Sequence, residues 1–158
     1  MNNIFSFSKN PPYCRCDANM FPLSKPDVNL FDTTAKLVAE ELSTPEILKK
    51  YKGEWQIMLE KKANAPTQIR RFYDEVTLWS EKTKTTEAFD MNLPFIKMMN
   101  AKVAYAKGRE LVDDKFQALF SVCLGQITEA DEENLKKLHN FRNFLEAVVG
   151  FYKVARPK

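Results

Sequence analysis

Apolar side chains recur at helical spacing along most of the chain after residue 30. In the segment 32–42 they follow one another at steps of three and four, behind Asp32 or Thr33, either of which can cap a helix N-terminus. A second helix is predicted to begin at Thr44 and Pro45, because threonine caps helices and proline suits the first helical position. Its buried face would comprise Ile47, Leu48, Tyr51, Trp55, Met58 and Leu59.

The same spacing predicts further helices in the second part of the chain. Asp113 or Asp114 can cap one of them, and Thr128 with Asp131 can begin a long final helix that Pro157 ends. We therefore expect helices over residues 66–82, 92–108, 113–127 and 128–156, with a linker over residues 83–90.

The first 30 residues show no sustained periodicity and contain four of the eight prolines. Proline removes a backbone donor and disfavours helix in the residue before it, so we expect an irregular, extended arm over residues 1–30. No β-strand period is found between residues 32 and 156. The sequence thus predicts an all-α fold, in which a single-domain helical bundle of about five to six helices over residues 31–158 follows the arm.

Composition narrows the chemistry that the chain can support. Its 158 residues are 44% hydrophobic, which is enough for one buried core. Only four glycines leave little for a phosphate-binding loop, and a single histidine with three cysteines argues against a zinc site. We therefore expect neither a metal nor a cofactor.

Cysteine usage and hydropathy indicate the compartment. Cys14, Cys16 and Cys123 do not form the pattern of a secreted disulfide framework. The N-terminus has no basic segment followed by an apolar core, and no run of roughly 18 apolar residues is present. We expect a cytoplasmic protein with reduced thiols.

Groups suited to catalysis are sparse. Cys14 or Cys16 could act with His139 only through a contact that folding creates over a long sequence separation. The acidic pairs lie at predicted helix starts, where they complement the helix dipole. An enzyme built on Cys14 or His139 is therefore the weakest of the hypotheses that we consider.

Positive charge is concentrated in the middle of the chain. Residues 45–110 carry thirteen Lys and Arg against nine Asp and Glu, while the whole chain has a net charge of +3. At 100° per residue, Lys102, Tyr105 and Arg109 form one strip, which Met98 joins. Such a strip can follow a phosphate backbone and stack a ring, although the two cations could instead lay their alkyl stems along the core edge.

Other basic residues on the predicted helices do not share that strip. Lys97 and Lys107 point elsewhere on the same helix. Arg70 and Arg71 occupy exposed positions next to acidic residues, and Arg142 can pair with a glutamate one turn further on.

Three segments in order resemble the helical small subunit of the type III-A CRISPR interference complex. They are TQIRRFYDEV (67–76), LPFIKMMNAKVAYAKGRE (93–110) and FRNFLEAVVGFYK (141–153). Each is weak alone, whereas the ordered trio is specific, and the likeness covers roughly residues 30–156. The proline-rich arm with Cys14 and Cys16 has no place in this pattern.

The resemblance implies a non-catalytic, all-helical subunit that packs with copies of itself and with other subunits along guide RNA and target RNA. Basic residues would then contact the RNA backbone without reading sequence. The expected RNA-binding residues are Arg70, Arg71, Lys97, Lys102, Tyr105, Arg109 and Arg142. The competing hypothesis is a helical protein–protein interaction module with no direct RNA contact.

Overall fold

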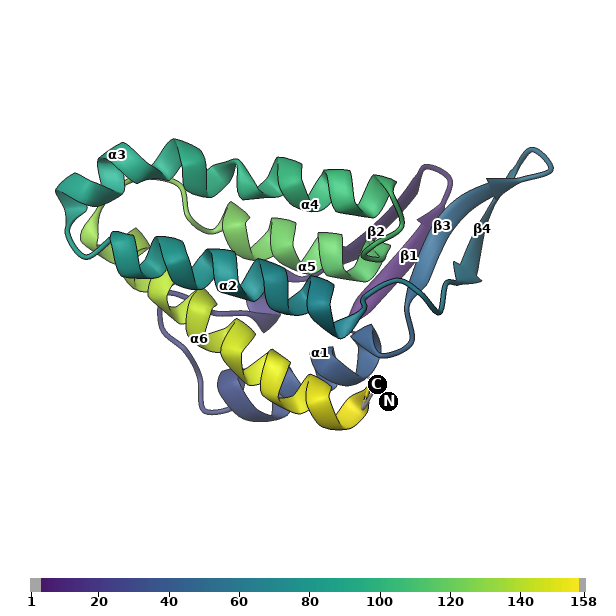
Figure 1. Cartoon of the computed structure of the whole chain (residues 1–158), viewed down its shortest axis with the longest axis horizontal. Coiled ribbons are helices and arrows are strands. Elements are labelled where there is room, and N and C mark those ends of the chain that lie inside the picture. Colours follow the sequence, from purple (N-terminus) through teal and green to yellow (C-terminus); the bar gives the residue numbers. More distant parts are fainter. Residues whose placement is uncertain (1–3, 157–158) are drawn as a thin grey trace.

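The computed structural model describes residues 4–156, so the predicted helix stop at Pro157 lies outside the described residues. A body of helices carries two β-hairpins at one end (Figure 1). In chain order the elements are β1 (Phe5–Lys9), β2 (Pro12–Cys16), the 3-10 turn η1 (Ala18–Met20), the π-helical turn η2 (Leu30–Thr34), α1 (Ala35–Leu42), β3 (Glu46–Tyr51), β4 (Glu54–Leu59), α2 (Pro66–Lys82), α3 (Thr86–Lys97), α4 (Met99–Gly108), α5 (Asp114–Gly125) and α6 (Glu132–Ala155).

The prediction of an all-α fold is wrong, because the segment expected to form a helix after Pro45 is the antiparallel hairpin β3–β4. Lys52 and Gly53 connect its strands with φ angles of 52° and 83°. Two consecutive positive φ values are typical of the type I′ turn, whose twist matches that of paired strands. Four of the six residues predicted to form a buried helical face are exposed, and only Ile47 and Leu48 at the base of the hairpin are buried.

The arm expected to be irregular also contains a hairpin. Strands β1 and β2 pair antiparallel with Lys9 opposite Pro12, so the proline stands at the first position of its strand. Proline is tolerated at such a position, because the ladder there needs no donor from it. After the hairpin, Phe21 and Leu23 are fully buried in the core. Burial against the rest of the protein orders this segment. The local spacing of apolar residues carries no signal for such long-range contacts.

The helices predicted after residue 66 are present with two differences. Helix α2 spans the predicted range, and Asp113 and Asp131 cap α5 and α6 through their side chains. The expected linker over residues 83–90 is wrong, because Thr85 accepts a hydrogen bond from the Ala88 amide and begins α3 there. The helix predicted over 92–108 is divided at Met98 between α3 and α4.

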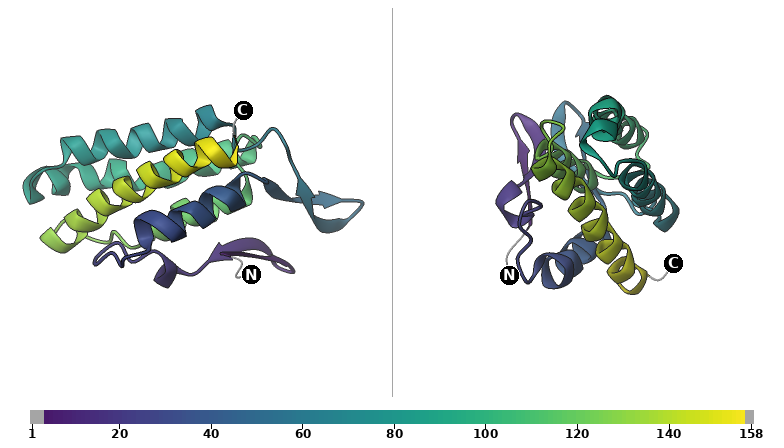
Figure 2. Two further views of the ribbon diagram at one scale, coloured as in Figure 1. Left: turned by 90° about the horizontal axis from the view of Figure 1, so that it is seen from below. Right: turned by 90° about the vertical axis from the view of Figure 1, so that its left-hand side faces the viewer.

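The core is built around α5 and α6. Phenylalanine rings form a chain across it, with centroid separations of 5.9 Å between Phe72 and Phe120 and 5.1 Å between Phe120 and Phe141. Helix α6 packs against α1 and α2, and β2 packs against α5 (Figures 1 and 2). Helix α2 packs against α6 and helix α4 packs against α5, and the outer sides of both helices face solvent.

The first turn of α5 connects the helical body to the second hairpin. Asp113 accepts the Glu46 amide at 2.9 Å, and Asp114 accepts the Leu48 amide at 2.7 Å. Lys115 is 1% exposed, and its ammonium donates to two carbonyl oxygens, one in the last turn of α1 and one in the segment that follows it, at 2.6 and 2.8 Å. The same ammonium lies 3.2 Å from the Glu46 carboxylate. Strand β3 is therefore held at its base by side chains of α5.

Lys115→Met should destabilise the fold strongly, because it leaves two carbonyl oxygens and a carboxylate without their donor. We expect a loss of about 3 kcal/mol in the free energy of unfolding, measured by urea denaturation. Lys36→Met, at an exposed position of α1, is the matched control and should change that free energy by less than about 0.5 kcal/mol. Equal effects of the two substitutions would show that the Lys115 contacts do not stabilise the fold.

Candidate nucleic-acid interface

Three of the predicted RNA-binding residues lie together on the outer side of α4, and we call Lys102, Tyr105 and Arg109 the α4 strip. Tyr105 is 65% exposed. The Arg109 guanidinium lies 5.8 Å from the centre of the Tyr105 ring and donates to its hydroxyl at 3.4 Å. No carboxylate within residues 4–156 lies at ion-pair distance from Arg109. A cation supported by an aromatic ring is thus presented to solvent at the end of the helix.

Lys102 is engaged by an acidic residue of the neighbouring helix. Its ammonium lies 2.7 Å from the Glu75 carboxylate of α2, and the Lys102 side chain is 43% exposed. Exposed ion pairs stabilise proteins by about 0–1 kcal/mol, so a phosphate can compete for this ammonium. Arg71 lies one turn before Glu75 and hence on the same side of α2. The α4 strip and Arg71 therefore belong to one side of the molecule.

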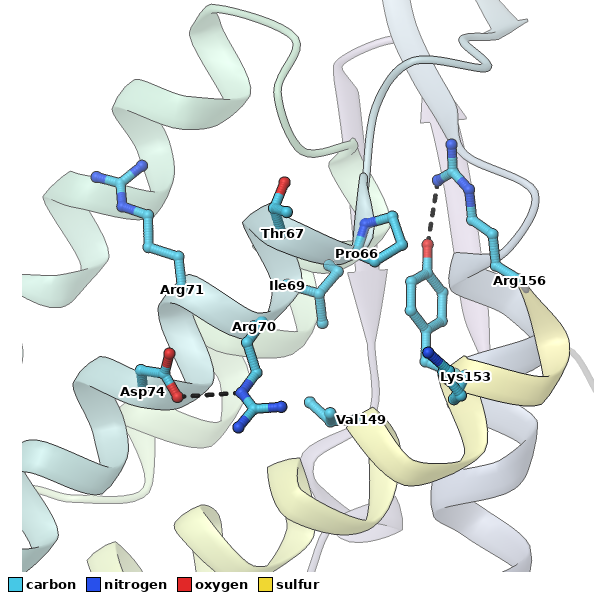
Figure 3. A pocket seen from close by; sticks show the side chains of 10 residues that line it. Pro66, Thr67, Ile69, Arg70, Arg71, Asp74, Val149, Lys153 and Arg156 are labelled. Carbon is cyan, nitrogen blue, oxygen red and sulfur yellow. Dashed lines mark hydrogen bonds and ion pairs between the residues drawn. The ribbon is translucent and has the colours of Figure 1, made fainter. Parts of the chain in front are cut away.

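Arg70 faces the other side of α2, towards α6. A groove of about 670 Å³ lies there, with Ile69, Val149 and Tyr152 among its lining residues. In Figure 3, Arg71 extends away from the space between Arg70 and Val149. Arg71 also lines this groove, so both arginines border it, and Arg71 stands on the side of α2 that carries Glu75.

Two of the four cations that line this groove, Arg70 and Arg156, are engaged within the protein. Arg70 lies 3.2 Å from the Asp74 carboxylate in the same helix. Arg156 donates to the carbonyl oxygens of Lys61, Ala63 and Asn64, at 2.6, 2.6 and 2.8 Å. Arg156 therefore fixes the end of α6 to the segment before α2, a role that its position beside Pro157 in the sequence did not indicate.

Arg142 and Lys97 lie away from the α4 strip. Arg142 pairs with Glu146 at 3.1 Å in α6, as the sequence suggested. The Lys97 ammonium donates to the carbonyl oxygens of Leu124 and Ile127 at 2.6 and 2.9 Å, and burial lowers its pKa. Lys97 thus satisfies carbonyl groups at the end of α5. The spacing of apolar residues in α3 carries no signal for this contact, because its partners lie 27 and 30 residues further along the chain.

The thiols and the histidine are poorly placed for catalysis. Burial raises the pKa of Cys14, and it raises the pKa of Cys16 to about 12, so both thiols stay protonated at neutral pH. His139 is hydrogen-bonded through Nδ1 to the buried Ser80 hydroxyl, which connects α6 to α2. Cys14 and His139 are not brought together, since Cys14 lies in β2 beside the first turn of α5.

No group of three or more His, Cys, Asp or Glu side chains within residues 4–156 is arranged to hold a metal ion. None of the helices in this range is long and apolar enough to cross a membrane.

Comparison with known proteins identifies one match. A protein-family model described as Csm2 Type III-A matches residues 26–158. No curated protein and no solved structure matches the chain. The matched range includes α2, the α4 strip and the β3–β4 hairpin, whereas β1 and β2 precede it.

The environment of His139 predicts a pH dependence of stability. Burial lowers its pKa below the usual value of 6.5, with Lys84 and Arg142 adding to the effect. The unfolded chain therefore binds a proton at higher pH than the folded protein does, and stability should fall as pH decreases below about 6.5 towards the folded pKa. Urea denaturation between pH 7.5 and pH 5.5 should show a smaller loss for His139→Gln than for the unsubstituted protein. An equal loss in both would mean that other groups cause the pH dependence.

Proposed function

Because the chain belongs to the Csm2 family of type III-A CRISPR interference complex subunits, we propose that it is a non-catalytic architectural subunit that binds RNA. It packs in several copies along the guide RNA–target RNA duplex and contacts the RNA backbone without reading sequence. Other subunits of the complex and copies of this chain are its protein partners.

The α4 strip carries this proposal. Arg109 presents a guanidinium with no carboxylate partner among the described residues, and guanidinium binds phosphate oxygens through two parallel hydrogen bonds. Tyr105 adds an exposed ring beside it. Lys102 and Arg71 extend the positive surface across α2 and α4. Contacts of this kind position a protein on the backbone and carry no sequence information.

A few contacts with RNA in each copy are sufficient for binding if the copies are held together in an assembly. The net charge of +3 is modest for an isolated RNA-binding protein. Copies held in a row bind the same strand with a high effective concentration, so their weak contacts add along its length. The protonated state of the half-buried Cys14 and Cys16 thiols supports a non-catalytic role. The Ser80 hydroxyl that contacts His139 supports it too, because this hydroxyl is buried away from any substrate.

A protein–protein module without direct RNA contact is the second candidate function. An exposed apolar surface favours it, since Leu78 of α2 is 46% exposed, and Met91 and Phe95 of α3 are 75% and 51% exposed. The Phe95 ring stacks on Trp79, with centroids 6.1 Å apart, which connects the two helices. Exposed apolar groups of this kind often mark sites of protein association.

Reversing the charge of the α4 strip separates these two functions. The double variant Lys102→Glu and Arg109→Glu should bind single-stranded RNA more weakly, because two phosphate contacts become repulsive. The slope of log Kd against log salt should decrease by about 1.4 if each cation neutralises one phosphate. Fluorescence anisotropy with a labelled oligouridine over a range of salt concentrations measures both quantities.

The matched control is the double variant Lys25→Glu and Lys36→Glu, which changes the net charge equally at two exposed positions outside the strip. It should leave the salt slope close to that of the unsubstituted protein. If RNA binding and its salt slope are unchanged by the α4 double variant, while assembly with partner subunits is lost, the protein–protein module is the correct function.

Glu75→Gln should strengthen RNA binding, because it releases the Lys102 ammonium from its ion pair. An exposed pair is worth up to about 1 kcal/mol, so the gain in affinity should be up to about fivefold. Asp74→Asn removes the same charge from the adjacent position, where the carboxylate pairs with Arg70 towards α6. Equal gains from both variants would indicate a general effect of net charge and would count against a contact at Lys102.

A further inference from the structure

The β3–β4 hairpin projects beyond the helices next to the end of α4 (Figures 1 and 2). Its outer half has the sequence KKYKGEW and carries three lysines against one glutamate. Lys50 and Lys52 have no carboxylate at ion-pair distance within the described part of the chain. This half of the hairpin contributes little to the core, because Tyr51 and its neighbours are exposed. Its composition therefore needs an explanation other than packing.

The strand register divides the outer half into two faces. Residues paired across the strands share a face, and successive residues alternate between faces. Tyr51 pairs with Glu54 and Lys49 with Gln56, so Lys49 and Tyr51 lie on the first face. Trp55 pairs with Lys50 on the second face, which continues through the exposed Ile57 and Leu59. We call these the Tyr51 face and the Trp55 face.

The Tyr51 face is turned towards the end of α4. The Lys49 ammonium lies 3.2 Å from the carboxylate of Glu110, the residue that follows Arg109. This ion pair places the Tyr51 face next to the end of the α4 strip, with the carboxylate of Glu110 beside Lys49. Lys52 lies at the tip with its ammonium 5.4 Å from the centre of the Tyr51 ring, and Tyr51 is 51% exposed.

We propose that the Tyr51 face binds an unpaired segment of RNA, with a base stacked on Tyr51 and the adjoining phosphates bound by Lys49 and Lys52. This rests on the proposed function and extends it from backbone contacts on a helix to recognition of single-stranded RNA. Exposed aromatic rings flanked by cations are the usual means of binding unpaired nucleotides, because every base offers a face for stacking. The centre of a buried protein interface is usually depleted in lysine, whereas the Tyr51 face carries Lys49 and has Lys52 at its tip.

Tyr51→Ala tests the proposal in the full chain. It should weaken binding to a labelled oligouridine roughly 5- to 150-fold, the range expected for loss of one stacked base. Binding to a blunt RNA duplex of the same length should change little, because its bases are already stacked on one another. Tyr51→Phe keeps the ring and should bind oligouridine as the unsubstituted protein does.

Trp55→Ala is the matched control on the other face of the same hairpin. It should leave oligouridine binding unchanged, and thermal unfolding of both alanine variants checks that the fold is intact. The proposal is overturned if Tyr51→Ala binds oligouridine normally, if it weakens duplex binding equally, or if its only effect is on assembly with protein partners.

Comparison with the α4 double variant distinguishes failure of this proposal from failure of the proposed function. If the α4 variant loses RNA binding and Tyr51→Ala does not, the hairpin proposal is wrong while the proposed function stands. If neither variant affects RNA binding, both are wrong. If only Tyr51→Ala does, the chain binds RNA through the hairpin and not through α4.

Discussion

The first turn of α5 is the constraint that holds the β3–β4 hairpin and the helices α1 and α4 in their relative positions. Asp113 and Asp114 bind amides of β3, and Lys115 binds carbonyl groups at the end of α1. Asp114 also lies 3.1 Å from the ammonium of Lys107 in α4. A charged sequence of three residues thus satisfies backbone groups that would otherwise be buried without partners, which is costly. Because its partners come from three separate elements, their relative positions are fixed together.

This cluster also brings the candidate RNA-binding groups into register. The contacts from Asp114 to β3 and to Lys107 help to fix the hairpin relative to α4, together with the Asp113–Glu46 contact and the packing of β3 on α5. In this position Lys49 meets Glu110 beside the end of the α4 strip. Buried electrostatics in the core therefore determine which exposed cations are neighbours. The arrangement of the exposed residues at this end of the molecule therefore depends on contacts that are themselves buried.

The sequence predicted the parts of the fold that follow from local periodicity and capping. The helices α5 and α6 and their aspartate caps are confirmed, since a helix with one apolar face needs only a partner surface to form. The β3–β4 hairpin was missed because its apolar residues also fit a helical period, while Lys52 and Gly53 and the distant Asp113 and Asp114 decide the outcome. For the site, helical geometry placed Tyr105 and Arg109 together, but the partners of Lys97 depend on tertiary contacts that no local pattern encodes.

Some cations of the chain bind backbone groups of the fold while others face solvent, and this division bears on the proposal that a chain of modest charge binds a polyanion. Lys97, Lys115 and Arg156 donate to carbonyl oxygens of the protein backbone, so their charge already satisfies groups of the fold. Phosphate cannot compete there, because moving these donors would leave carbonyl groups unsatisfied. At the end of α4 and on the adjoining hairpin, by contrast, Arg109 and Lys52 rest only against aromatic rings. A phosphate can bind these two cations without disrupting the fold, and their position, more than the total charge, supports the proposal that this end of the molecule contacts RNA.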